Sequence, residues 1–403
     1  MTAETDRHAR RTALTLSAAQ AIVGSAAPIC ISMGGLTGVY LLGPDKALAT
    51  APVTGFNIGT ALGALPAAWL MRALGRRYGF MSGALVTAIG GAVATMAIFA
   101  GNFWLFAFGL LIVGSGNSFV QQYRFAAADN APAHFKPTAI SWVLGGGVFA
   151  AIIGPQTVIF TRELFAPVMF AGSFTAIIGL AAIGAAVLWT LQLHKHTKAV
   201  ASADDHHPPR PLTTIVAQPK FLIAIACGIS SYALMSFVMT GAPLAMVGCG
   251  FTPEEATLGI SWHVMAMFAP SFFTGKLIAR FGKETIVAIG MALLIGCGIV
   301  ALSGIELWQF WTALILLGVG WNFGFIGATA MVAETYRPSE RNKTQGLHDF
   351  LLFTTVAFAS LMSGQTYNAF GWDMLNWIIF PVAIACLLLL AVQVVMRGRR
   401  AEA

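Results

Sequence analysis

The sequence predicts an all-α membrane protein with twelve transmembrane helices in two pseudo-symmetric six-helix bundles. Three observations predict it: long apolar stretches follow one another along the chain, the basic residues gather on one side of them, and the second half repeats the plan of the first. Hydrophobic residues make up 57% of the 403 residues and charged residues 10%. A typical soluble domain has about 25% charged residues, so a soluble fold of this length is excluded.

Twelve stretches are long enough to span a bilayer, since about 20 apolar residues cross its ~30 Å of hydrocarbon. They cover residues 16–42, 47–71, 80–100, 103–124, 139–160, 167–193, 221–247, 256–279, 284–303, 307–332, 345–367 and 374–396. The first stretch begins after two arginines, as a signal peptide does, but it is too long for one and leads directly into another span. We therefore expect it to be retained as the first span.

The basic residues fix the orientation. With the N-terminus in the cytoplasm, every Lys and Arg except Lys46 and Arg162 falls on the cytoplasmic side, as the positive-inside rule requires. This arrangement predicts an even number of spans with both termini in the cytoplasm. The net charge of +7 is then explained by anionic lipid headgroups, and nucleic acid is not an expected partner.

A polar tract divides the spans six and six. We expect an N-terminal bundle at 1–193, a cytoplasmic linker at 194–219 and a C-terminal bundle at 220–403. Prolines in the tract disfavour a continuous helix. Its histidines are better explained by a solvated linker than by a metal site, because no acidic residue inside a span accompanies them.

Other chemistry is not indicated. The five cysteines show no metal or redox spacing, and no phosphate-binding loop of the Gly-x-x-x-x-Gly-Lys type is present. No catalytic grouping lies at a common depth. We therefore predict no cofactor, no metal, no direct coupling to ATP and no enzyme activity.

The two halves share three features in the same order. Basic, glycine-containing loops follow spans two and eight, and the sequences Gly-x-Gly-Asn and Gly-x-Gly-Trp-Asn end at Asn117 and Asn322 in spans four and ten. Beyond each comes an acid, Asp129 or Glu334, and then a basic turn with proline. Repeated halves of this kind are typical of transporters that rock one half against the other around a midplane site.

These loops resemble the signature of the major facilitator superfamily, Gly-x-Leu-x-Asp-Arg-x-Gly-Arg-Arg, and the resemblance covers essentially the whole chain. The matching residues are Leu70, Gly75, Arg76 and Arg77 in the first copy, and Gly275, Leu277, Arg280, Gly282 and Lys283 in the second. The family's Asp is replaced by Arg72 and Ala279, so its usual charge lock is in question. The resemblance implies a gate built from Arg76, Arg77, Asp129, Arg280 and Glu334, while a role in topology alone is the alternative for each.

The resemblance also bears on energy coupling and direction. The span-four Arg of many proton-coupled members is absent, because Arg124 lies at the cytoplasmic end of that span. The glycine ladder of drug antiporters is only partly present in span five, at 145–147 and 154–155. Efflux of drugs or metabolites by proton antiport therefore stays open as an alternative, as does a receptor without transport activity.

Polar residues inside the spans are the candidates for substrate binding. No Asp, Glu, Lys or Arg falls near the bilayer centre; since charges there are usually kept for function, this favours a neutral or weakly charged organic solute. The resemblance implies that spans one, four, seven and ten line the cavity. The candidates are Gln20, Asn57, Asn117, Gln121, Trp142, Tyr232, Trp262, Trp321 and Asn322. Each polar group could instead hold helices together.

His263 is the one histidine well inside a predicted span. Imidazole titrates near neutrality, so His263 is the candidate for proton coupling. A neutral histidine hydrogen-bonded between helices is the alternative, and so is transport without protons.

The sequence thus predicts a secondary transporter of small organic solutes in a bacterial inner membrane, most simply a monomer. Residues 55–59 and 121–124 resemble a bacterial branch of the family that includes riboflavin importers. Uptake of riboflavin or a similar flat metabolite is the function this resemblance implies.

Overall fold

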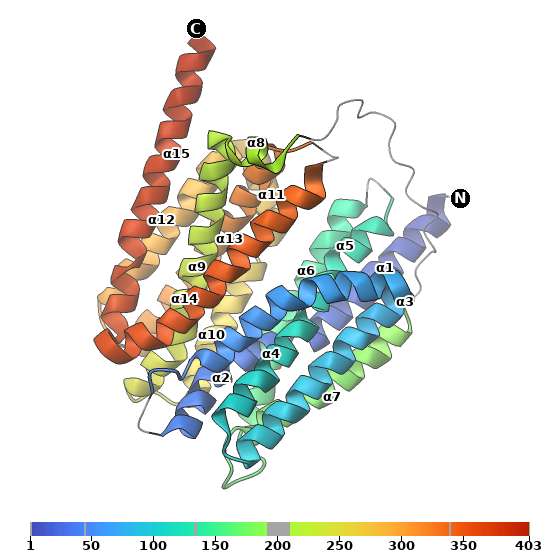
Figure 1. Cartoon of the computed structure of the whole chain (residues 1–403), viewed down its shortest axis with the longest axis vertical. Coiled ribbons are helices and arrows are strands. Elements are labelled where there is room, and N and C mark those ends of the chain that lie inside the picture. The colour runs from blue at the N-terminus through green and yellow to red at the C-terminus, as the bar shows by residue number, and fades with distance from the viewer. Residues whose placement is uncertain (1, 44–45, 133–134, 192–209, 338–339, 403) are drawn as a thin grey trace.

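A computed structural model describes residues 2–43, 46–132, 135–191, 210–337 and 340–402. These residues form helices and no strand. The helices are α1 (Thr2–Val23), α2 (Ala26–Leu42), α3 (Ala51–Phe99), α4 (Phe103–Val120), α5 (Tyr123–Asp129), α6 (Lys136–Thr161), α7 (Ala171–Trp189), α8 (Leu212–Val216), α9 (Pro219–Gly248), α10 (Pro253–Phe268), α11 (Ser271–Phe281), α12 (Lys283–Leu302), α13 (Leu307–Ala333), α14 (Arg341–Trp377) and α15 (Ile379–Glu402). Figure 1 shows their arrangement.

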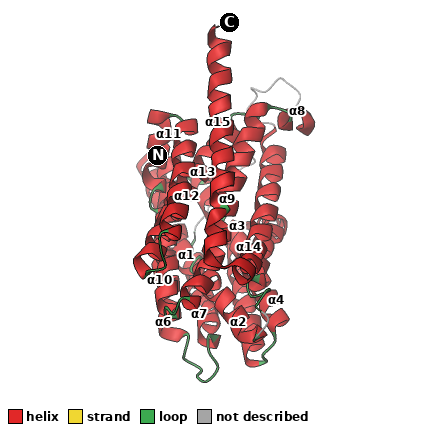
Figure 2. Ribbon diagram, turned by 90° about the vertical axis from the view of Figure 1, so that its left-hand side faces the viewer, coloured by secondary structure: helices red, strands yellow, loops and turns green. Residues whose placement is uncertain are grey.

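The helices form two groups that follow the chain. Helices α1–α7 lie together in one half, and α8–α15 lie together in the other (Figure 1). Most run roughly along the long axis of the molecule (Figure 2), and both ends of the chain lie toward the same end of the bundle. The halves meet where α6 packs on α10, α3 on α14 and α2 on α9.

The described helices account for all twelve predicted spans. By length and composition, nine stretches could cross a membrane, or ten if the bent pair α10 and α11 counts as one span. One of them, Phe350–Val394, covers most of the last two predicted spans. The predicted span 47–71 is not among them, because Asn57, Pro66 and several glycines lower its mean hydropathy, but it forms the first part of α3.

The first predicted span is not one straight helix. Helix α1 begins near the N-terminus, well before residue 16, and the helix breaks between Val23 and Ala26. Pro28 has no amide hydrogen to continue the backbone ladder, and the bonds at the break include shorter-range ones from Ser25 N–H to the Ile22 carbonyl and from Ala27 N–H to the Gly24 carbonyl. A second break, with a bend of 43°, separates α10 from α11 beside Pro270.

The two copies of the signature loop adopt the same backbone conformation. Gly75 has φ 80° and ψ 159°, and Gly282 has φ 83° and ψ 152°. Residues with a Cβ are strongly disfavoured there. At Gly75 the chain turns from one span of α3 into the next, and at Gly282 it turns from α11 into α12. The glycines of the repeated motif therefore make the same reversal in both halves.

Candidate functional site

Aromatic side chains form a cluster in the C-terminal half, which we call the aromatic cluster: Tyr232 on α9, Trp321 and Phe325 on α13, and Phe353 on α14. The Trp321 and Phe325 rings are stacked, with centroids 5.3 Å apart and planes 12° apart. The Tyr232 ring stands edge-on to both, at 5.3 Å from Trp321 and 5.2 Å from Phe325. Phe353 completes the group at 6.1 Å from Tyr232. The sequence-predicted residues Tyr232 and Trp321 are thus brought together.

The aromatic cluster lies next to the boundary with the N-terminal half. Phe268, at the end of α10, has its ring centroid 6.4 Å from that of Trp321. A Cβ added at Gly147 of α6 would lie 3.2 Å from the Phe268 ring. The glycine therefore allows α6 of one half to pack directly on the aromatic side chains of the other.

Asn322 holds the break between α10 and α11. It is fully buried, and its Nδ2 donates to the Met267 carbonyl at 2.6 Å and to Ser271 Oγ at 2.7 Å. Its Oδ1 accepts a hydrogen bond from Thr274 Oγ1 at 2.6 Å. A carbonyl that a helix break exposes inside a membrane needs a new partner, and Asn322 supplies one to Met267. This placement favours the interhelical role over substrate binding.

Asn117, the counterpart in the N-terminal half, is placed differently. It is half-buried, and its Nδ2 donates to Thr60 Oγ1 at 3.4 Å. Thr60 and Met267 occupy matching positions, 15 residues before Gly75 and Gly282 respectively. The same asparagine position therefore faces the same helix position in both halves, but only Asn117 keeps most of its hydrogen-bonding capacity for another partner.

The other candidates of the N-terminal half differ in burial. Gln20, Asn57 and Trp142 are half-buried, whereas Gln121 is exposed at the end of α4. The Trp142 ring packs edge-on against Phe135 at 5.4 Å. The structure does not gather these residues into one cluster with the aromatic side chains of the C-terminal half.

Trp262 lies apart from the aromatic cluster. It is 44% exposed and shares a face of α10 with exposed Ala269, while buried Ile260, Val264 and Met267 occupy the opposite face. Substrate binding by Trp262 therefore stays a prediction.

His263 is enclosed between α10 and α13. Its side chain is fully buried, Nδ1 lies 2.8 Å from the Leu314 carbonyl, and Nε2 has no hydrogen-bond partner among the described residues. The bond to Leu314 is the interhelical contact that the sequence left open as the alternative to proton coupling.

The gate candidate Glu334 forms an ion-pair cluster at the end of the bundle where the termini lie. Lys220 and Lys283 both hydrogen-bond to its carboxylate. Burial raises the pKa of Glu334, but the hydrogen bonds and charges of the two lysines outweigh it and hold the pKa below its usual value. Lys283 occupies the place of a signature arginine, so this acid and the second signature loop are in direct contact.

The remaining gate candidates make different contacts. The Arg77 guanidinium lies 4.7 Å from the Trp189 ring centroid, and that of Arg280 lies 5.1 Å from the Phe281 ring centroid. Arg76 is half-buried near Arg77. The side chain of Asp129 lies outside the described residues, so the N-terminal counterpart of the Glu334 cluster is not described.

A second charged cluster was not predicted. Glu340 is buried, and Arg210, within the linker, donates to it from Nε at 2.8 Å and from a terminal nitrogen at 2.7 Å. Arg210 also donates to the Thr335 carbonyl at 2.9 Å. The hydrogen bond from Arg210 holds the pKa of Glu340 well below its usual range. Sequence spacing gives no signal for this pair, because 130 residues separate its members.

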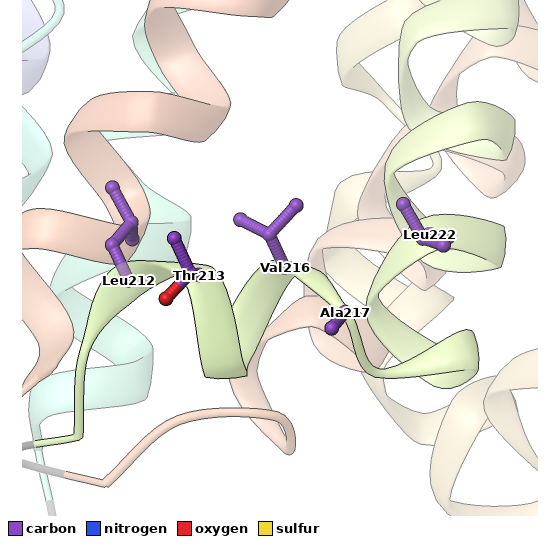
Figure 3. A pocket seen from close by; sticks show the side chains of 5 residues that line it. All are labelled: Leu212, Thr213, Val216, Ala217 and Leu222. Carbon is purple, nitrogen blue, oxygen red and sulfur yellow. The ribbon is translucent and has the colours of Figure 1, made fainter.

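The described residues also line two apolar grooves. One, of about 440 Å³, is lined by α8 and the start of α9, and Figure 3 shows its side chains: Leu212, Thr213, Val216, Ala217 and Leu222. The other, of about 540 Å³, lies between α3 and α7. Neither contains a predicted site residue.

The sequence profile of the Major Facilitator Superfamily matches residues 12–326 and 232–402. The chain belongs to this superfamily. The partially occluded inward-open structure of the xylose transporter XylE from E. coli has the same fold, with a TM-score of 0.70 at 14% identity over 95% of this chain and 97% of that one. The predicted all-α membrane fold is therefore confirmed.

Two curated relatives are informative about the branch. The chain is 51% identical to the riboflavin transporter RfnT of Brucella anthropi over 98% of each chain. It is 24% identical to the class H tetracycline resistance protein of Pasteurella multocida over 79% of this chain and 80% of that one. The predicted transporter class and its nearness to riboflavin importers are confirmed by the first match.

Proposed function

We propose that this chain imports riboflavin, or a flat metabolite of the same ring chemistry, across a bacterial inner membrane by alternating access. One observation carries the proposal: the chain matches the riboflavin transporter RfnT at 51% identity over 98% of both lengths. No segment large enough to form a separate substrate site is left outside this match.

The side chains suit such a substrate. Riboflavin has a flat, uncharged ring with amide-like groups, and the aromatic cluster offers stacked rings beside the boundary between the halves. Half-buried Asn117 adds an amide with spare hydrogen-bonding capacity. Ion pairs such as those of Arg210 with Glu340 and of Lys220 with Glu334 lie at helix ends or loops. A site of this composition is apolar with a few polar groups, as small-molecule sites generally are.

The basic residues support the orientation and the gate. We propose that both termini face the cytoplasm, as the positive-inside rule requires. The Glu334 cluster then lies on the cytoplasmic side, where Lys220 and Lys283 join the starts of α9 and α12 to the end of α13. This cluster would stabilise one state of the gate without touching the substrate.

Complementation tests the proposal. A riboflavin-auxotrophic bacterium without its own importer should grow on low riboflavin when it expresses this chain, but not with an empty vector. Cell-associated riboflavin should rise at the same time. Lower cell-associated riboflavin with the chain than with the vector would indicate export instead, and no change with the protein present in the membrane would contradict the proposal.

A further inference from the structure

The indole N–H of Trp321 lacks a partner. Trp321 is 7% exposed, and its Nε1 has no hydrogen-bond partner among the described residues. Leaving a buried donor unsatisfied costs about 1–3 kcal/mol. A cost of this size at a buried polar group calls for an explanation, and a ligand that supplies the missing acceptor is one.

The other buried tryptophan of the same half shows the usual arrangement. Trp372 is 6% exposed, and its Nε1 donates to the Ala301 carbonyl at 3.3 Å. Half-buried Trp311 likewise donates to the Glu255 carbonyl at 3.1 Å. Of these three tryptophans, Trp321 alone lacks an acceptor for its N–H, and it is also the one that belongs to the aromatic cluster.

The surroundings of Trp321 define what a ligand must offer. Its ring is already stacked with Phe325 and met edge-on by Tyr232, so the cluster presents rigid aromatic faces and edges. Phe268 lies between Trp321 and Gly147 of the other half. Separation of the two halves in the proposed alternating access would open the contact between Phe268 and Gly147 and make the Trp321 edge reachable from the boundary.

We propose that the aromatic cluster is the subsite for the ring of the substrate, and that the Trp321 N–H donates to a carbonyl oxygen of that ring. This assignment rests on the proposed function and narrows it to flat heteroaromatic compounds with a ring carbonyl. Stacking on the cluster supplies contact area for many flat molecules. The N–H selects those that carry an acceptor at the ring edge, because any other ligand leaves the donor unpaired.

Two matched variants test the subsite. Trp321→Phe keeps an aromatic ring and removes the orphan N–H, whereas Trp372→Phe makes the same change in a tryptophan whose N–H is bonded. Riboflavin binding to the purified full-length protein is measured by quenching of flavin fluorescence. We expect the dissociation constant to rise about tenfold in Trp321→Phe, the loss of one hydrogen bond that leaves a buried acceptor unpaired, and to change less than twofold in Trp372→Phe.

The melting temperature gives an independent readout. Both variants lose similar volume, but only Trp372→Phe loses a hydrogen bond, so Trp321→Phe should melt higher than Trp372→Phe. Lumichrome, which has the ring carbonyls but no sugar chain, should lose affinity for Trp321→Phe by the same factor as riboflavin does.

The outcomes separate this inference from the proposed function. Wild-type protein that does not bind riboflavin would overturn the proposed function and the subsite together. Wild-type binding with unchanged affinity in Trp321→Phe would overturn the subsite alone. A lower melting temperature for Trp321→Phe than for Trp372→Phe would show that the Trp321 N–H is bonded in the free protein. Unchanged lumichrome binding in Trp321→Phe would show that the Trp321 N–H contacts the sugar chain of riboflavin. Either result overturns the assignment.

Discussion

Replacing Asn322 with Ala should destabilise the protein by removing the contacts that hold the α10–α11 break. The change deletes three hydrogen bonds of the Asn322 side chain, to Met267, Ser271 and Thr274. Side-chain hydrogen bonds between helices in a membrane average about 0.6 kcal/mol each. Three of them give a loss of about 2 kcal/mol in the free energy of unfolding.

Two comparison variants make this magnitude testable. Thr274→Val removes one of the three bonds; because the single Thr274 hydroxyl proton is shared between Asn322 and the Pro270 carbonyl at 2.8 Å, the variant loses one bond and should cost about a third as much. Asn117→Ala, at the equivalent position, removes one long bond of 3.4 Å on a half-buried side chain and should cost about 0.6 kcal/mol or less. The order expected is Asn322→Ala well above Thr274→Val, with Asn117→Ala at or below the latter.

The assay can use the protein's own cysteines. Cys30, Cys227, Cys297 and Cys386 are free and buried, so a thiol-reactive dye reports unfolding of detergent-solubilised protein. Riboflavin binding should be weakened more by Asn117→Ala than by Asn322→Ala, since the Asn322 amide is already saturated. Equal loss of stability in the two asparagine variants, or stronger loss of affinity in Asn322→Ala, would refute the reasoning.

Three further changes probe other parts of the molecule. Glu340→Gln should remove a pH dependence of stability. Because the pKa of Glu340 is lowered in the folded protein, its ion pair with Arg210 stabilises the fold above the ordinary glutamate pKa of 4.5, and this stabilisation is lost as the pH falls below that value. The melting temperatures of wild type and variant should therefore converge in acid. His263→Asn retains a donor where Nδ1 contacts the Leu314 carbonyl, so we expect cells with this variant to accumulate substrate as wild type does. His263→Phe loses the donor and should lower the melting temperature. Loss of accumulation with normal exchange in His263→Asn would instead support proton coupling. Gly146→Val should prevent assembly of the N-terminal half, because a Cβ there would lie 2.2 Å from a backbone oxygen of α1, and a normally folded variant by size-exclusion chromatography would contradict this.

The spans, the duplication and the family could be predicted because they depend on composition and local pattern. Hydropathy and the basic residues locate helices in a bilayer, and glycines required by a positive φ recur at Gly75 and Gly282. The breaks are local too, but Pro28 and Pro270 permit either a kink or an interruption, and the sequence does not decide which.

The roles of individual polar residues could not be predicted, because they depend on what lies across the helix interface. Asn117 and Asn322 are equivalent in sequence, yet the break between α10 and α11 leaves the Met267 carbonyl to accept a hydrogen bond from the Asn322 amide. Glu334 was expected at the gate, but Lys220 was not expected as its partner. The pairing of Arg210 with Glu340 brings together residues 130 positions apart. Only the packed structure shows these contacts.

Transport by the purified protein tests the central claim most directly. Proteoliposomes that contain the full chain and are preloaded with unlabelled riboflavin should take up external radiolabelled riboflavin by exchange, faster than empty liposomes. Excess unlabelled lumichrome should inhibit this exchange, and excess xylose should not. Exchange that is no faster than in empty liposomes, with protein shown to be folded and inserted, would contradict the account.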